Sequence, residues 1–379
     1  MLCALLLVSC AVSPQEGVAP SRFERRVPSQ SAIALMATQR GAWIAWAGDL
    51  IAPDLYVQPV GSAQPWRFPI SGVPTQISLL PLAERRLAVL WLEGSLGTAT
   101  HLQCATLEPD GSLRRAPFDI GVAQRYSAIA APDGGILAFT ITDGVLSAVR
   151  LDRLGRPFSR QRLAEAAHLV AATLDQRDQL HVLWLRPSDG QLWQLLYMSF
   201  ESALLDQSAP RLPAPTLLAV LRLADGAYFE SLSISADSER LYVLWNAVSV
   251  SAEGESAQLA GLSFPLDAPL QSRALDLSAL PGNLRAVRLL NVDSAPRGAP
   301  SLVGSLLPRQ MIYGALTAQG VFRLGRLQAA SNDEVLIGQA AALSENNALH
   351  LAWLAQDPQG RAMLRYVVLP RPQPSVAPS

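Results

Sequence analysis

Two histidines in this sequence are candidates for metal binding, because of their side chains and their places in a repeat. His181 and His350 occupy the same place in two copies of a repeated phrase, and a neutral imidazole is a common metal ligand. Equivalent positions in different repeats are held apart by the repeat itself, so we interpret both histidines as structural. No Cys-x-x-Cys motif or Cys/His cluster occurs, and we therefore expect neither a metal nor a cofactor.

Three carboxylates, Asp49, Glu93 and Asp143, follow apolar segments and could face a channel or a loop surface. Glycoside hydrolysis needs two carboxyl groups at a defined separation, which a sequence cannot show, so we interpret all three as turn or solvated residues. All 30 basic residues are arginine, which excludes a Schiff base and a phosphate-loop lysine. No nucleophile elbow or metalloprotease helix motif is present. We assign no catalytic residues and leave the ligand-binding residues open.

The charge balance limits the class of partner. The formal net charge is −1 and 16% of the residues are charged, below the roughly 25% of an average soluble domain. Because no basic surface is indicated, we expect no nucleic-acid partner. Half of the residues are hydrophobic, so an ordered core is expected.

The first ten residues form an apolar run that ends in Leu-Val-Ser-Cys at Cys10. This resembles the bacterial lipobox, whose cysteine is diacylated and becomes the new N-terminus. The resemblance implies a signal peptide at residues 1–9, a lipid on Cys10, a tether at residues 10–20 and a place on the extracytoplasmic side of a cell membrane. The run is short and lacks a positive start, so we expect the natural start upstream of Met1. The alternative is a buried N-terminal strand.

No stretch after residue 10 approaches the roughly 18 consecutive apolar residues that a membrane-spanning helix requires. Two acyl chains hold a protein at a bilayer without such a helix. We therefore expect the lipid anchor to be the only membrane contact.

An apolar phrase that usually ends in tryptophan recurs along the chain. Clear copies lie at residues 87–91, 180–184, 241–245 and 349–353, a looser copy at 42–46, and degenerate copies at 136–140 and 301–305. Their ends are 45, 49, 44, 61, 60 and 48 residues apart. Propeller blades of four strands repeat at about 40 to 50 residues, and we attribute the two longer intervals to longer loops. Five tryptophans are expected to pack between blades rather than stack on sugars: Trp46, Trp91, Trp184, Trp245 and Trp353.

The same order of strands recurs around each phrase. A strand of small residues precedes it, as at 127–130 and 231–235, and turns rich in Asp, Asn and Gly join the two. A third strand follows, and then a more polar fourth strand, as at 157–163 and 321–327. Arginines in the fourth strand would discourage edge-to-edge pairing.

The last unit has only three strands before a Pro-rich tail at 371–379, whereas residues 21–27 precede the first unit and are similar to the fourth strand at 157–163. We predict an all-β fold, a seven-bladed β-propeller of four-stranded antiparallel blades at residues 21–370. In this ring the N-terminal strand completes the last blade. A pair of β-sandwiches and an open solenoid are the alternatives; closure is favoured because a ring has no exposed ends to cap.

The phrase at 180–184, followed by a turn and an aromatic strand, resembles the blades of bacterial sialidase-like and Asp-box propellers. In that family three arginines bind a carboxylate, a Tyr/Glu pair is the nucleophile and an Asp is the acid/base. Arg26-Val-Pro-Ser is similar to the segment that supplies the family's first arginine. Ser188-Asp-Gly-Gln-Leu-Trp193 is the segment nearest to the Asp box, and it lacks spacer residues. Those sialidases have six blades, and Arg26 falls in a predicted outer strand.

We therefore expect a membrane-anchored extracytoplasmic platform without catalytic activity, which binds a protein or glycan of the cell envelope through loops on one face. The long insertions at residues 248–258 and 291–300 are the candidate contact surface, because a propeller carries function on loops. The alternative is a carbohydrate-active propeller, either a sialidase-like hydrolase or a lectin.

Overall fold

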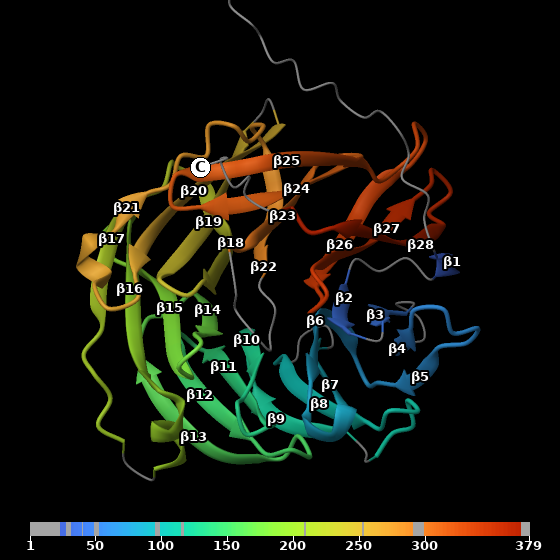
Figure 1. The fold of residues 1–379 in the computed structure, drawn as a ribbon, viewed down its shortest axis with the longest axis horizontal. Coiled ribbons are helices and arrows are strands. Elements are labelled where there is room, and N and C mark those ends of the chain that lie inside the picture. Colours follow the sequence, from blue (N-terminus) through green and yellow to red (C-terminus); the bar gives the residue numbers. More distant parts are fainter. Residues whose placement is uncertain are drawn as a thin grey trace, which may run out of the picture.

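The computed structural model describes residues 23–27, 32–39, 41–48, 53–94, 99–114, 117–207, 210–251, 254–290 and 299–372. These residues form seven four-stranded antiparallel sheets, arranged as blades around a centre (Figure 1). The predicted seven-bladed β-propeller is confirmed, and the sandwich and solenoid alternatives are wrong.

Each blade runs outward from a first strand at the centre of the ring. The first strands are β2 (Ile33–Thr38), β6 (Val73–Pro81), β10 (Arg125–Ala130), β14 (Leu169–Leu174), β18 (Ala227–Ala236), β22 (Leu284–Leu290) and β26 (Val335–Leu343). The second strands are β3 (Gly41–Ala47), β7 (Leu87–Gly94), β11 (Ile136–Thr142), β15 (Gln179–Pro187), β19 (Arg240–Ser251), β23 (Ser301–Leu306) and β27 (Ala348–Gln356). All seven predicted phrases lie in these second strands.

The outer half of each blade consists of a third and a fourth strand. The third strands are β4 (Asp54–Pro59), β8 (His101–Leu107), β12 (Val145–Leu151), β16 (Leu192–Glu201), β20 (Gly254–Pro265), β24 (Gln310–Thr317) and β28 (Ala362–Pro370). The fourth strands are β5 (Trp66–Pro69), β9 (Phe118–Val122), β13 (Pro157–Ala164), β17 (Thr216–Arg222), β21 (Arg273–Ala274), β25 (Gly320–Gln328) and β1 (Phe23–Val27).

Three short 3₁₀ helices connect strands of the described chain: η1 (Ala83–Arg85), η2 (Ser202–Asp206) and η3 (Pro269–Gln271). None of the described helices is long and apolar enough to cross a membrane.

The turns between first and second strands are built by short polar side chains. The Asp175 carboxylate accepts hydrogen bonds from the backbone N–H groups of Arg177 and Gln179, at 2.8 and 2.9 Å. Asp237 does the same for Glu239 and Arg240, at 2.8 Å each. An Asx side chain that bonds its own backbone replaces a missing ladder bond and tightens the reversal. The Asp-bearing turns predicted from the sequence therefore stabilise these hairpins.

The tryptophans of the repeated phrase lie between blades, as expected. Trp46, Trp91, Trp184 and Trp353 are all at most 2% exposed and belong to the clusters that join neighbouring sheets. Trp245 is only partly buried and packs against the cluster between the fourth and fifth blades. Aromatic side chains bury large apolar areas, so one such residue in each of five blades supplies much of the packing between them.

The two ends of the ring meet in one sheet. β1 pairs antiparallel with β28, from Phe23 opposite Tyr366 to Val27 opposite Ala362, and gives the sheet the order β1-β28-β27-β26. Figure 1 shows β1, in blue, beside the red strand β28. Each first strand contacts the next around the centre, and β26 contacts β2. The predicted closure by the N-terminal strand is confirmed.

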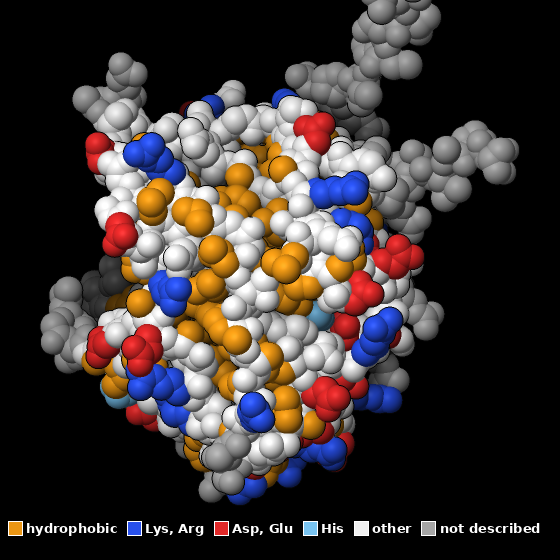
Figure 2. Space-filling model, turned by 90° about the vertical axis from the view of Figure 1, so that its left-hand side faces the viewer, with side chains coloured by type: hydrophobic (Ala, Val, Ile, Leu, Met, Phe, Trp, Pro, Cys, Tyr) orange, Lys and Arg blue, Asp and Glu red, His pale blue; other side chains and the backbone are white. Residues whose placement is uncertain are grey.

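The fourth strand of the fourth blade, β17, departs from the expected polar edge. Its sequence is Thr-Leu-Leu-Ala-Val-Leu-Arg, and Leu217 and Val220 are 46% and 56% exposed. Figure 2 views the outer side of the ring where β17 and β21 lie in Figure 1, and hydrophobic side chains gather on that side. Leu218 and Leu221 pack toward the fifth blade, which explains why apolar residues are retained in this edge strand.

Candidate functional site

The seven first strands enclose a central channel of about 470 Å³. All of them run in the same direction along it, so they begin at one face of the ring and end at the other. We call the face at which they begin the hairpin face, because the turns between second and third strands also lie there. The other face is called the opposite face. The channel lining is mostly small or apolar, and every blade contributes at least one Ala, Ser or Leu residue.

Four first strands are irregular near their beginnings, at the hairpin face. Pairing shifts by one residue beside Thr75 in β6, Glu230 in β18 and Ile337 in β26. In β22 the shift spans Ala286 and Val287, and Ala286 has a φ of 49°. Bulges redirect side chains at the rims of closed sheets. Regular strand pairing is therefore interrupted at the mouth of the channel in these four blades.

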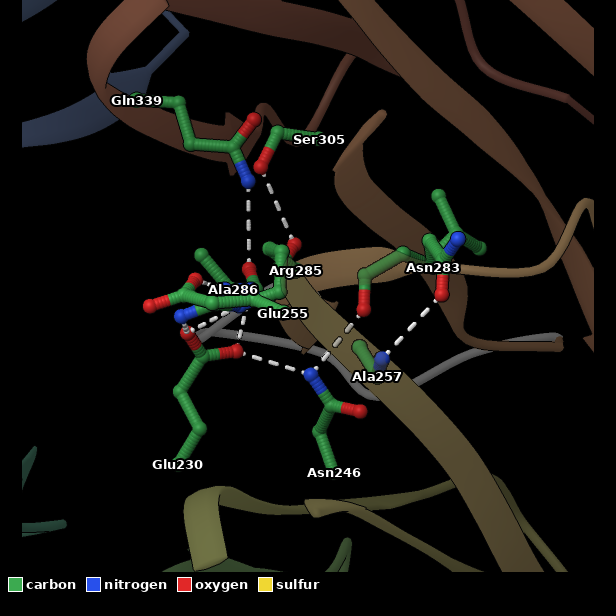
Figure 3. A network of polar contacts seen from close by, with 10 residues as sticks. Glu230, Asn246, Glu255, Ala257, Asn283, Arg285, Ala286, Ser305 and Gln339 are labelled. Atoms are coloured by element: carbon green, nitrogen blue, oxygen red, sulfur yellow. Dashed lines mark hydrogen bonds and ion pairs between the residues drawn. The ribbon is translucent and has the colours of Figure 1, made fainter. Parts of the chain in front are cut away.

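The irregularities of β18 and β22 build a polar network, drawn in Figure 3. One oxygen of Glu230 accepts a hydrogen bond from the Arg285 guanidinium at 2.6 Å. Its other oxygen accepts from the Asn246 amide at 2.8 Å and from the Ala286 backbone N–H at 3.0 Å. Arg285 also forms an ion pair with Glu255. These two carboxylates raise the pKa of Arg285, so the guanidinium is held in its charged form.

The network joins three blades. Glu230, Asn246 and Glu255 belong to the fifth blade, and Arg285 belongs to the sixth. Gln339 of the seventh blade donates a hydrogen bond to the Ala286 carbonyl at 3.1 Å. Side-chain hydrogen bonds in partly enclosed sites are stronger than in water. The network therefore fixes the positions of these blades at the hairpin face.

The strands β19 and β20 form a long hairpin that projects from the hairpin face. β19 continues for six residues past Trp245, to Ser251, whereas the other second strands continue for at most three residues past their phrase. At about 3.3 Å per residue, the additional three residues reach about 10 Å further. The hairpin is braced by the Arg285–Glu255 ion pair and by the Asn283 side chain, which accepts from the Ala257 N–H at 3.2 Å.

Two apolar side chains are exposed on one side of this projection. Tyr228 is directly opposite Val248 in the β18–β19 ladder, and Val250 lies two residues further along β19. Tyr228 and Val250 are 42% and 56% exposed, while Val248, opposite Tyr228 in the ladder, is fully buried. Neighbours at this diagonal spacing share one face of a sheet. They form an exposed apolar patch on a rigid element, which we call the hairpin patch.

The two histidines singled out from the sequence lie in separate blades, as predicted. His181 Nδ1 is 2.8 Å from the Tyr197 hydroxyl, and its Nε2 is 3.5 Å from Asp175. His350 makes the equivalent bond to Tyr366, at 2.5 Å between Nδ1 and the hydroxyl. Both histidines are buried. The structure therefore supports their structural interpretation.

The three carboxylates are not brought together. Glu93 is 8% exposed and accepts hydrogen bonds from the Trp91 indole at 2.7 Å and the Ser71 backbone N–H at 3.0 Å. Asp143 forms a turn with a φ of 49° and pairs with Gln124. Asp49 lies outside the described residues. Glu93 is buried, so its interpretation as a turn or solvated residue was wrong: it is an acceptor inside the second blade.

The residues that carry the family resemblance lie away from the channel. Arg26 is exposed on β1, the outermost strand of the last blade. The segment 188–193 forms the turn between β15 and β16, with the Ser188 N–H donating to the Leu192 carbonyl at 2.8 Å. Cys10 precedes the described residues. The expected outer position of Arg26 is confirmed.

The two long segments expected to form the contact surface differ in how much of each the structure describes. Residues 248–258 are not a loop: apart from 252–253, which are outside the described residues, they extend β19 and β20. Residues 291–298 are also outside the described residues, but Leu290 and Ser301 flank this segment at the opposite face. The expectation that 248–258 form a loop was wrong, because these residues extend two strands, whereas the expectation for 291–300 stays a prediction.

Sequence reasoning missed the two arginines of the channel lining, Arg125 and Arg288. Each lies in a first strand, where the other lining residues are mainly small or apolar. A signal was present in Leu284-Arg-Ala-Val-Arg-Leu-Leu290, because an arginine in a first strand has no outer edge to protect. The first strand of the sixth unit was not identified from the sequence, so the signal was not used.

Comparison of the sequence with known protein families and with curated protein sequences gives no match. Solved structures show the same fold. A PL25 polysaccharide lyase, an ulvan lyase bound to -[GlcA(1-4)Rha3S]-, has 12% identity and a TM-score of 0.60, covering 94% of this chain and 97% of its own. A protein of unknown function from Dyadobacter fermentans has 10% identity and a TM-score of 0.51, over 92% of this chain and 99% of its own. At these identities the likeness concerns the fold alone.

Proposed function

We propose that the protein is a non-catalytic binding platform on the extracytoplasmic side of a cell membrane, anchored by a lipid on Cys10. In this proposal the hairpin patch is the contact surface for a protein of the cell envelope. The observation that carries it is a pair of exposed apolar side chains, Tyr228 and Val250, on a projecting and braced hairpin.

The physical argument concerns what such a patch does in water. Tyr is enriched among the residues that dominate binding energy, and such residues lie in rigid, well-packed surroundings. The buried Val248 lies opposite Tyr228 in the same ladder, and the Arg285–Glu255 ion pair links the hairpin to the sixth blade. Binding of a partner over Tyr228 and Val250 would therefore cost the platform little conformational entropy.

The alternative is a carbohydrate-active propeller. This chain is similar in fold to the oligosaccharide-bound PL25 lyase. A hydrolase needs two free carboxyl groups. Among the described residues that line the channel, Glu230 is the one carboxylate, and both of its oxygens are bound to Arg285, Asn246 and the Ala286 N–H. This arrangement favours binding over hydrolysis.

The test places a photo-crosslinking amino acid at position 250 of the membrane-anchored protein in its native host. We expect a crosslinked envelope protein, identified by mass spectrometry, and we expect the crosslink to disappear when Tyr228→Ser is added. Loss of one central aromatic contact weakens binding by about 2 kcal/mol or more, close to thirtyfold.

The matched control places the same crosslinker at position 158. Phe158, on the fourth strand of the third blade, is 55% exposed, as Val250 is. Crosslinking of the same protein from both positions, or from neither, contradicts a specific role for the hairpin patch. Crosslinking of a glycan from position 250 supports the carbohydrate alternative instead.

A further inference from the structure

The channel lining combines two cations with mostly uncharged side chains. Arg125 begins β10 at the hairpin face, and Arg288 is the fifth of seven residues in β22, past the register shift. Apart from Glu230, the other described residues that line the channel are uncharged. Glu230 is already bound by Arg285. The lining is therefore electrostatically unbalanced in favour of anions.

Among the described residues, neither arginine has a polar partner. In the part of the chain that the structure describes, no hydrogen bond or ion pair involves the guanidinium of Arg125 or Arg288, while Arg285, three residues before Arg288, has two carboxylate partners. A guanidinium carries five donors in a fixed fork and stays charged. An enclosed charge without a partner is costly. Such a cost is commonly retained where a ligand supplies the missing partner.

Arg288 and Tyr126 of β10 both line the channel. Burial raises the pKa of Tyr126, and the positive charge of Arg288 acts against that rise. The Tyr126 hydroxyl is itself bonded to Ser78 and to the Leu90 carbonyl, at 3.0 and 3.1 Å. In the described part of the chain, no hydrogen bond joins this hydroxyl to Arg288.

The surroundings of Arg288 indicate a ligand inside the channel rather than a contact outside. Its side chain is exposed, yet burial by the surrounding strands lowers the pKa of its guanidinium. Arg288 is one of the residues that line the channel, so its exposed surface faces this enclosed space. A volume of about 470 Å³ falls in the usual range for small-molecule sites. Its Ala, Leu and Ser lining would contact the uncharged part of such a molecule.

We propose that the central channel binds an organic carboxylate of about monosaccharide size, with Arg288 paired to the carboxylate and Arg125 attracting the anion at the mouth. The planar fork of an arginine matches a carboxylate in a two-bond pair. The proposal does not depend on the hairpin patch, because Arg288 lies inside the ring and the patch lies on its rim.

The experiment titrates the full-length protein with D-glucuronate and with D-glucose, which share a ring and differ in the carboxylate, and follows binding by calorimetry. We expect binding of glucuronate, no detectable binding of glucose, and weaker binding as salt rises. Arg288→Gln should lower the affinity for glucuronate about tenfold or more, as expected for the loss of a charged hydrogen bond. Arg222→Gln, at an exposed position of β17, is the matched control and should bind as the unaltered protein does.

Three outcomes overturn the proposal. The first is that glucose and glucuronate bind equally well, or that neither of them binds at millimolar concentration. The second is glucuronate binding that Arg288→Gln leaves unchanged. The third is inorganic sulfate binding as tightly as glucuronate, since only the anion would then be recognised. Arg288→Gln removes an enclosed charge and should fold with an unchanged or higher Tm, so lost binding with a normal Tm is attributable to the channel.

Discussion

At the scale of single residues, Asn246 is a polar residue at a repeat position that is apolar in other blades. It follows Trp245 directly, and the equivalent positions in other blades carry apolar residues such as Leu92, Leu185 and Leu354. Asn246 is fully buried, and its amide donates to Glu230 and to the Leu284 carbonyl at 2.8 and 3.0 Å. The polar side chain is therefore explained by the network and not by packing.

Asn246→Leu restores the apolar residue of the other blades and tests this explanation. We expect it to destabilise the protein by about 1–3 kcal/mol, because the Glu230 carboxylate and a buried carbonyl lose their donor. The measurement is urea unfolding, combined with Glu230→Leu in a double-mutant cycle. If the two residues act together, the double variant should lose less than the sum of the single losses. A stabilised Asn246→Leu would show that packing dominates at this position.

The roles of residues were predicted correctly where their positions in the repeat defined them. His181 and His350 were assigned to the core because they occupy equivalent positions in two blades, and their bonds to Tyr197 and Tyr366 repeat the same geometry. Arg288 was missed because the first strand of the sixth unit was not identified, so this arginine was not separated from the many arginines of outer strands. Glu230 and Arg285 lie 55 residues apart, and only the register shifts of β18 and β22 bring them together.

At the scale of elements, β1 joins two blades and not only two ends of the chain. Val27 is 6% exposed in the cluster between the last and first blades. Glu24 pairs with Arg365 of β28 at 2.9 Å, and Arg25 donates to Gln58 of β4 at 3.0 Å. The strand therefore covers the edge of β28 and also links the seventh blade to the first.

Deletion of residues 1–27 should destabilise the ring, whereas deletion of residues 1–20 should leave it unchanged. The longer deletion exposes the apolar contacts of Val27 and Phe23 and the ion pair of Glu24, a loss of about 3–5 kcal/mol. It also leaves the edge of β28 unpaired, which favours aggregation. Urea unfolding midpoints and light scattering measure both effects. Equal midpoints for the two deletions would contradict closure by β1.

The order of strands could be predicted because each strand is short and its pattern recurs. The apolar phrase defined the second strands, and the Asp- and Asn-bearing turns defined the ends of the first strands. The length of the β19–β20 hairpin was mistaken for a loop, although Ala247-Val-Ser-Val-Ser251 continues the alternation of a strand. The apolar edge of β17 was also unexpected, because its packing against the fifth blade is a contact between units that no single repeat contains.

At the scale of the whole molecule, the closed ring was predicted from counting units and from one surplus strand. Seven phrases and a displaced fourth strand were sufficient, because closure has few geometric solutions. The channel and its charge were not predictable in this way, since they depend on seven first strands placed side by side. Membrane anchoring stays a prediction from Cys10, which precedes the described residues.

The anchor has a direct measurement. We expect the mature N-terminal peptide from the native host's membranes to begin at Cys10 and to carry the mass of a diacylglyceryl group. Cys10→Ala should move the protein out of the membrane fraction without changing its Tm, because the propeller begins beyond the tether. An unprocessed N-terminal peptide in the cytosol would contradict export and anchoring alike, and would leave the fold unaffected.

The direction of β1 has a consequence for orientation. As the fourth strand of its blade, β1 begins at Phe23 on the opposite face and runs toward the hairpin face, where β2 begins. Phe23 therefore lies on the side of the ring remote from Tyr228 and Val250. With a lipid on Cys10, the twelve residues from 11 to 22 could span at most about 40 Å. A lipid anchor would then hold Phe23 within about that distance of the bilayer, while the projecting hairpin and the adjacent channel mouth lie at the other face of the ring.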